Sequence, residues 1–286
     1  MLHFFKNTFT HFLNSNTFQK GASLAYYAVF SLFPMIIIVT SLLGILFGKE
    51  AVSGEIYTQL KDVLGSDAAQ QIQELIKNQH KQHNSIFTSI IGFVTLVLGA
   101  SGMFNQIHSS FNSIWGIKAK PKNSIVRYFT KHITSFSILI LLFLIILVST
   151  TMTSFLIKYA DTLHSDYRFV YVYEHFISFL AVGLVFTLMF KFLSDAKVYW
   201  KAALAGGLFT SFLFMIGKIG IGMYIGHSHI SSTFGSASVL ALIMLWVYYT
   251  SQIIYLGASF VKVISDKLNL EIVPGDQAVK IEEREM

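Results

Sequence analysis

Long apolar stretches alternate with short polar ones along the whole chain, and this pattern predicts a protein that crosses a membrane several times. The hydrocarbon core of a bilayer is roughly 30 Å thick, so a spanning helix needs about 20 apolar residues. The stretches that reach or nearly reach this length are 22–47, 86–104, 133–157, 175–192, 202–225 and 234–261. We therefore expect an all-α polytopic membrane protein whose six transmembrane helices form one membrane domain, residues 21–265.

Amphipathic segments precede and interrupt these spans. Residues 1–20 place apolar and polar side chains on opposite helical faces, which fits a helix lying on the membrane surface or one packed beneath the bundle. The loop 48–85 has two stretches of helical apolar spacing separated by Gly65–Ser66, so we expect a small extracytoplasmic cap of two helices. The polar tail 266–286 is broken at Pro274–Gly275 and is expected to be flexible.

Basic residues are distributed unevenly between the loops, and this predicts the orientation. Loop 105–132 carries five Lys or Arg and no acid, and loop 193–201 carries two Lys and one Asp, whereas loop 226–233 has no Lys or Arg. Loops rich in Lys and Arg stay in the cytoplasm. With six spans, both termini are then also cytoplasmic, and loop 48–85 lies outside.

The composition supports a membrane protein. Charged residues make up 13% of the 286 residues, against about 25% in soluble domains. The net charge of +6 favours contact with anionic membrane lipids over a nucleic-acid partner. The absence of cysteine excludes disulfides and thiolate metal sites.

Lys218 is the one charged residue in the interior of the six apolar stretches. A lysine at the centre of a spanning helix costs on the order of 3 kcal/mol, and no Asp or Glu within the spans can pair with it. Its ammonium group either reaches the outer-loop carboxylates of Asp161, Asp166 or Glu174, or bonds backbone carbonyls and hydroxyls, or contacts an anion in a wet cavity. Pro34 kinks the first span, either as a static bend or as a cavity wall, and Ser31 can satisfy the freed carbonyl. The candidate ligand-binding residues are Lys218, Ser31, Pro34 and Tyr224.

Small and polar residues near the span ends suggest close helix packing. Gly206 and Gly207 form small-x3-small pairs with Ala202 and Ala203, which favour close helix contact. After the second span, Asn112 fits a hydrogen bond at a helix end and Trp115 fits an interfacial anchor, while Trp246 lies deep enough to be core.

No known catalytic pattern is visible in the sequence. A Ser/His/Asp arrangement, a P-loop, a GxGxxG loop and a carboxylate pair at membrane depth are all missing. His227 and His229 lack an adjacent third ligand, so we expect no metal site there. We expect a protein that is not an enzyme and needs no cofactor.

Several short blocks occur along the chain in a particular order and spacing. They include Ala22–Tyr27, Ser31–Pro34, Gly99, Gly102, Asn112, Trp115, Gly206, Gly207, Gly235, Trp246 and Gly257. Taken together, these blocks resemble the YihY/BrkB family of membrane proteins, historically labelled "ribonuclease BN-like". The resemblance implies six spans in the bacterial cytoplasmic membrane. A nuclease would need clustered His and Asp ligands that this sequence lacks, so we expect no ribonuclease activity.

Two functional hypotheses follow from these observations. In the first, the protein binds or transports lipid or another amphiphilic anion, with Lys218 contacting the phosphate. In the second, it is an envelope scaffold or assembly partner that acts through loop 48–85. The expected partners are membrane lipids and either a second copy of the chain or another envelope protein.

Overall fold

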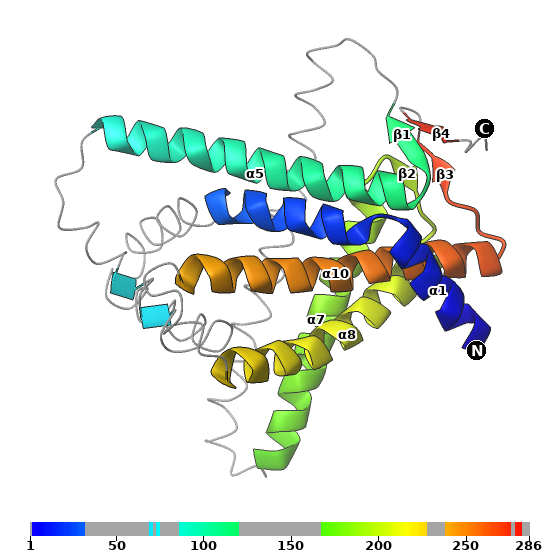
Figure 1. Ribbon diagram of the computed structural model, residues 1–286. Helices are drawn as coiled ribbons and strands as arrows, with labels where there is room; N and C mark the ends of the chain where they lie inside the picture. Colours follow the sequence, from blue (N-terminus) through cyan, green and yellow to red (C-terminus); the bar gives the residue numbers. More distant parts are fainter. Residues whose placement is uncertain are drawn as a thin grey trace. The chain divides into compact units, whose positions relative to one another are not determined.

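The predicted apolar stretches form helices wherever the structure describes them (Figure 1). The computed structural model describes residues 2–31, 69–70, 73–74, 86–119, 167–227, 238–275 and 278–281. The main helices are α1 (Leu2–Asn14), a helix over residues 17–31, α5 (Ile86–Ile114), α7 (Tyr167–Phe192), α8 (Trp200–His227) and α10 (Ser238–Lys267). Short strands connect or follow them: β1 (Ile117–Ala119), β2 (Ala196–Lys197), β3 (Val273–Pro274) and β4 (Ala278–Lys280).

Three helices of the described part of the chain are long and apolar enough to cross a membrane. They correspond to three of the predicted spans and comprise His175–Phe192, Trp200–Ile221 and Ser238–Lys267. The predicted second span lies within the uninterrupted helix α5. The predicted third span, most of the first span, and the cap 48–85 apart from residues 69–70 and 73–74 lie outside the described residues. The count of six spans therefore stays a prediction.

A continuous apolar stripe runs along the exposed side of α8. Its members recur every three or four residues: Leu204, Leu208, Phe212, Ile216, Ile219 and Met223. At 1.5 Å per residue the stripe is about 28 Å long, which is close to the thickness of the hydrocarbon core. Soluble proteins rarely expose a continuous apolar surface of this size. This face of α8 is the one suited to contact lipid.

In the part of the chain that the structure describes, three helices are followed by a residue in the left-handed conformation. Asn16 follows α1 with φ 52°, Gly116 follows α5 with φ 67°, and Asn269 follows α10 with φ 54°. Glycine and asparagine adopt this conformation most readily, and it lets N–H groups beyond the helix satisfy the last free carbonyls. The N–H of Leu270, for example, donates to the Ser265 carbonyl at 2.9 Å.

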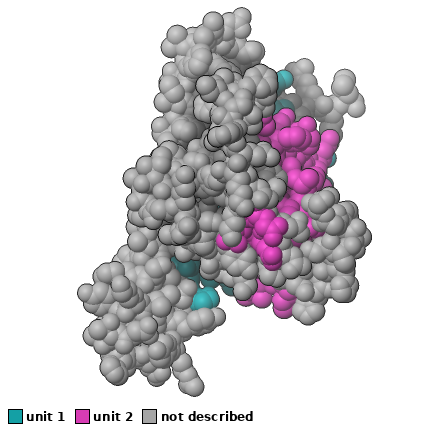
Figure 2. Space-filling model, turned by 90° about the vertical axis from the view of Figure 1, so that its left-hand side faces the viewer, with its two compact units in different colours: residues 1–17, 108–215, 253–286 teal, residues 18–107, 216–252 magenta. Residues whose placement is uncertain are grey.

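The chain divides into two compact units, which are coloured separately in Figure 2. Unit 1 comprises residues 1–17, 108–215 and 253–286, and unit 2 comprises residues 18–107 and 216–252. Helices α5, α8 and α10 each contribute residues to both units.

The core of unit 1 centres on Phe111, which is fully buried. Its ring centroid lies 5.4 Å from that of Trp115, 5.5 Å from that of Phe190 and 6.5 Å from that of Tyr255. Trp115 is only 2% exposed, and its Nε1–H donates to the Ala258 carbonyl at 2.9 Å. The prediction that Trp115 is an interfacial anchor is therefore wrong. Its indole N–H finds a backbone acceptor inside the protein and does not need water.

Small residues allow α7, α8 and α10 to approach closely in unit 1. A Cβ atom at Gly207 of α8 would lie 2.7 Å from both the Gly183 carbonyl oxygen and the Thr187 main-chain nitrogen of α7. Gly206 faces Val261 of α10, and Gly257 of α10 faces Thr210 of α8. In lipid, helix association depends on such close packing and on interhelical hydrogen bonds. One such bond runs from Ser211 Oγ to the Phe179 carbonyl at 2.8 Å.

A second close approach joins α5 to the helix over residues 17–31 within unit 2. A Cβ atom at Gly99 would lie 2.8 Å from the Ser31 main-chain nitrogen, and Gly102 faces the ring of Tyr27. Ser31 is buried and donates its hydroxyl to the Ala28 carbonyl at 3.1 Å. Gln106 of α5 donates to the Lys20 carbonyl at 3.3 Å.

The C-terminal segment contributes two short strands among the described residues. The flexibility expected for the tail 266–286 stays a prediction. β4 pairs antiparallel with β1, and β3 pairs antiparallel with β2. Outside the ladders, the N–H of Ile281 donates to the Gly116 carbonyl at 2.7 Å. Ile272 and Ala278 are buried, so two apolar side chains hold this otherwise polar segment against unit 1. Strands of two or three residues are too short to leave a periodic pattern in the sequence.

We expect Gly207→Ala to destabilise the protein, because its methyl group would meet the backbone of α7. Overpacking of this kind costs about 1–3 kcal/mol. Gly220→Ala in the same helix is the matched control, since nothing lies within 4 Å of an added Cβ there. That change should be neutral or stabilising by up to about 1 kcal/mol through helix propensity. Thermal unfolding in detergent, followed by tryptophan fluorescence, measures both, and equal losses would contradict the packing argument.

Candidate functional site

The four predicted ligand-binding residues do not form one site among the described residues. Lys218 and Tyr224 both lie exposed on α8. They are six residues apart, which at 3.6 residues per turn places them roughly 120° apart around the helix axis. Ser31 is buried against Gly99, and Pro34 lies outside the described residues, as does Gly235 of the predicted motif. Trp246, expected in the core, is half-buried on α10.

The position of Lys218 along α8 can be measured from Trp200. Trp200 begins α8, is half-exposed, and has the Lys191 ammonium group 5.4 Å from the centre of its ring. Tryptophan and lysine are enriched where a helix leaves the membrane. Lys218 follows eighteen residues later, or about 27 Å along the helix, against a hydrocarbon thickness of roughly 30 Å. Lys218 is thus closer to the end of the candidate span Trp200–Ile221 than to its middle.

A polar network connects α5 to the loop between α7 and α8 in unit 1. Asn112 Nδ2 donates to Asp195 Oδ2, and the Asp195 main-chain N–H donates to Asn112 Oδ1, both at 2.9 Å. His108 lies one turn earlier on α5, with Nε2 3.4 Å from Asp195 Oδ2 and Nδ1 3.4 Å from Asn112 Nδ2. A neutral His108 that carries its proton on Nε2 fits all of these contacts.

Asp195 also binds the C-terminal segment. Its carbonyl oxygen accepts the N–H of Gly275 at 2.7 Å, and a Cβ atom at Gly275 would approach that oxygen to the same distance. The hydrogen bond expected at Asn112 is therefore present, but the sequence analysis missed His108 and Asp195. Two features of the sequence could have indicated them. His108 and Asn112 are four residues apart and so lie on one helix face, and Asp195 is the single acid in the basic loop 193–201.

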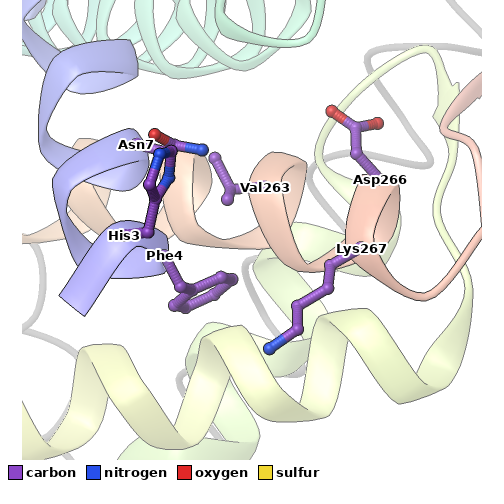
Figure 3. Close-up of a pocket in the computed structure, with 6 residues that line it drawn as sticks. All are labelled: His3, Phe4, Asn7, Val263, Asp266 and Lys267. Atoms are coloured by element: carbon purple, nitrogen blue, oxygen red, sulfur yellow. The ribbon is translucent and has the colours of Figure 1, made fainter. Parts of the chain in front are cut away.

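A pocket of 460 Å³ lies between α1 and the end of α10 in unit 1 (Figure 3). Its lining residues are His3, Phe4, Asn7, Val263, Asp266 and Lys267. The Lys267 ammonium group lies 5.2 Å from the centre of the Phe4 ring, a cation–π distance. The Asp266 carboxylate is bound at 2.8 Å by Lys262, one turn earlier on α10. Figure 3 shows the side chain of Lys267 reaching toward Phe4 and that of Asp266 pointing away from it.

Helix α1 presents two different faces. Its buried side includes Thr8 and Phe12, while Phe5, Phe9 and Leu13 form an apolar stripe that is 49%, 54% and 43% exposed. Helix α1 therefore packs against the rest of unit 1 and leaves one apolar face exposed. That residues 1–20 lie on the membrane surface stays a prediction. His3, Asn7 and His11, at four-residue spacing, form a polar row along the same helix.

His11 is the most enclosed residue of this polar row. Burial lowers the pKa of its imidazole below the usual 6.5, nearby Lys262 lowers it further, and Asp266 opposes the shift. Its buried Nδ1 has no hydrogen-bond partner among the described residues. Folding therefore favours the neutral ring.

The described helices are long and apolar, α8 exposes an apolar stripe, and small residues allow the helices to pack closely. These features define an α-helical integral membrane protein. The chain belongs to the virulence factor BrkB family, whose sequence profile matches residues 8–282. The resemblance to the YihY/BrkB family found in the sequence is thus confirmed. No solved structure matches the chain.

The curated relatives are also described as membrane proteins. A UPF0761 membrane protein of Saccharophagus degradans is 26% identical over 267 residues, which is 92% of this chain and 60% of the relative. Its counterpart in Teredinibacter turnerae is 23% identical, covering 93% of this chain and 61% of the relative. A UPF0761 membrane protein of Xanthomonas oryzae pv. oryzae is 28% identical, and the match covers 87% of this chain and 57% of the relative. The chain thus spans about three-fifths of the length of these relatives.

We expect Asn112→Ala to weaken the attachment of the α7–α8 loop, because it leaves the main-chain N–H and the carboxylate of Asp195 without this partner. An unsatisfied polar group of this kind costs about 1–3 kcal/mol. Asn105→Ala, at an exposed site on the same helix, is the control. Thermal unfolding and the rate of tryptic cleavage at Lys197 measure the effect. If Asn105→Ala has the same effect, helix propensity and not the network is responsible.

The low pKa of His11 predicts a stability that depends on pH. Unfolded His11 takes up a proton near its usual pKa of 6.5, whereas folded His11 does so only at lower pH. Between these values the unfolded state binds more protons, so stability falls as the pH is lowered through 6.5. The decrease should be smaller in His11→Gln but unchanged in His3→Gln, at an exposed site of the same polar row. Unfolding midpoints across this pH range test the prediction, and parallel curves for native protein and His11→Gln would refute it.

Proposed function

We propose that this membrane protein binds or transports phospholipid or another amphiphilic anion, and that Lys218 contacts the charged head group. The observation that carries the proposal is the exposed ammonium group of Lys218, about 27 Å along α8 from Trp200. At that depth the side chain can reach the lipid phosphates. A lysine that stays charged at the edge of the hydrocarbon core is stabilised by an anionic partner.

The neighbouring surface of α8 suits a lipid better than a soluble anion. Ile219 and Met223 are 65% and 58% exposed and belong to the apolar stripe described above. Acyl chains can pack along this stripe while the phosphate stays with Lys218. No ion pair or hydrogen bond to Lys218 is present among the described residues, so its ammonium group is available to a ligand. The proposed contact therefore lies on the helix surface and involves no catalytic residue.

The proposed location is the cytoplasmic membrane, with both termini in the cytoplasm. The basic loops 105–132 and 193–201 are expected on that side. In unit 1, β1 from the first loop pairs with β4, and β2 from the second loop pairs with β3. These pairings support a common side for both loops and the C-terminal segment.

The test uses purified protein in vesicles that contain a fluorescent phosphatidylglycerol, with a membrane-impermeant quencher to follow movement between leaflets. Loss of one hydrogen bond to a charged group corresponds to about a tenfold effect. Lys218→Ala should therefore lower the rate about tenfold, Lys218→Glu should lower it further, and Lys218→Arg should retain most of it. Lys201→Ala, which removes an exposed lysine from the first turn of α8, is the control and should have little effect. Equal rates for native protein, Lys218→Ala and Lys218→Glu would overturn the proposal.

A further inference from the structure

The pocket between α1 and α10 has the features of a site for an anionic head group. Its volume of 460 Å³ lies within the roughly 300–1,000 Å³ typical of small-molecule sites. Two elements distant in the sequence form it, with His3, Phe4 and Asn7 on α1 and Lys267 on α10. All of these residues belong to unit 1.

The charges around the pocket favour an anion. Lys262 already pairs with the Asp266 carboxylate, and so reduces the negative charge beside the opening. Lys267 contacts the face of the Phe4 ring and makes no ion pair among the residues that the structure describes. The Asn7 amide and the His3 imidazole add hydrogen-bond donors to the lining. The lining thus offers a phosphate group one ammonium group and two side chains that can donate hydrogen bonds.

The exposed apolar stripe of α1 indicates where this pocket lies in the membrane. Phe5, Phe9 and Leu13 leave an apolar face uncovered on the same helix that supplies His3, Phe4 and Asn7. An amphipathic helix inserts such a face about 5–10 Å into the boundary between head groups and acyl chains. The polar residues beside it are then at the depth of the lipid phosphates.

We propose that the α1–α10 pocket binds a phosphate ester, with Lys267 paired to the phosphate, and that the α1 stripe makes a membrane phospholipid its source. The proposal rests on the proposed function for the class of ligand, but it involves a different helix and a different lysine. In the predicted orientation this site faces the cytoplasmic leaflet, whereas Lys218 faces the outer one. A protein that moves lipid between leaflets needs a head-group contact on each side.

The experiment measures binding of phosphatidylglycerol to the full chain in detergent by native mass spectrometry. A parallel sample carries a photoreactive head group, and the crosslinked peptides are identified. Lys267→Ala should weaken binding roughly 5- to 10-fold and remove crosslinks to residues 2–14. Lys267→Arg should retain both. Lys6→Ala is the matched control, because it removes an exposed lysine of α1 that does not line the pocket.

The source of the phosphate is distinguished by competition. If inorganic phosphate displaces the lipid from native protein but has no effect on Lys267→Ala, the site binds phosphate from either source. If it does not compete, the lipid is the ligand. Unchanged lipid affinity and unchanged crosslinks in both Lys267→Ala and Asn7→Ala would overturn the proposal. That result would leave the Lys218 proposal standing if Lys218→Ala still slows lipid movement in vesicles.

Discussion

Asp195 joins three segments that are far apart in the sequence, and the arrangement of unit 1 depends on it. Its main-chain N–H and carboxylate bind Asn112 at the end of α5, and its carbonyl binds Gly275 beyond α10. Because buried polar groups need partners, these bonds determine the position of the loop between α7 and α8 as well as of the tail. The two short strand pairs join the same segments: β1, after α5, pairs with β4 of the tail, and β2, directly after Asp195, pairs with β3 of the tail. Asp195 thus connects both basic loops and the C-terminal segment, through its carboxylate and main-chain N–H on one side and its main-chain carbonyl on the other.

The second constraint is steric and concerns the helices themselves. Lipid chains are as apolar as leucine, so apolar burial alone does not bring spanning helices together. In the first half of α8, Leu204, Leu208 and Phe212 are exposed, whereas the buried face includes the small residues Ala202, Ala203, Gly206, Gly207 and Thr210. Close backbone approach allows many weak dispersion contacts and a few interhelical hydrogen bonds. A helix of a soluble protein buries its large apolar side chains, whereas this part of α8 exposes them and buries its small residues.

The sequence predicted the structure best where a single property, such as the length of an apolar stretch or the size of a side chain, determines the local structure. The length of an apolar stretch indicates a spanning helix, and the predicted spans after residue 167 are helical. Small residues at four-residue spacing indicated close contact at Gly206 and Gly207. Trp115 was misassigned because tryptophan suits both an interface and a core that offers an acceptor, here the Ala258 carbonyl. Neither the local pattern of α5 nor its charge could reveal that Asn112 would meet Asp195, 83 residues later.

The proposed depth of Lys218 determines which kind of partner can stabilise its charge. A charge at the centre of the bilayer must be neutralised within the protein, whereas a charge near the interface needs only a partner in the head-group layer. In the proposed orientation that layer is the outer one, where the positive-inside rule disfavours lysine in short loops. The helix has uncharged residues on both sides of Lys218 and no basic cluster around it. General attraction to an anionic surface uses several basic residues, so an isolated lysine among apolar neighbours is better suited to bind one phosphate group.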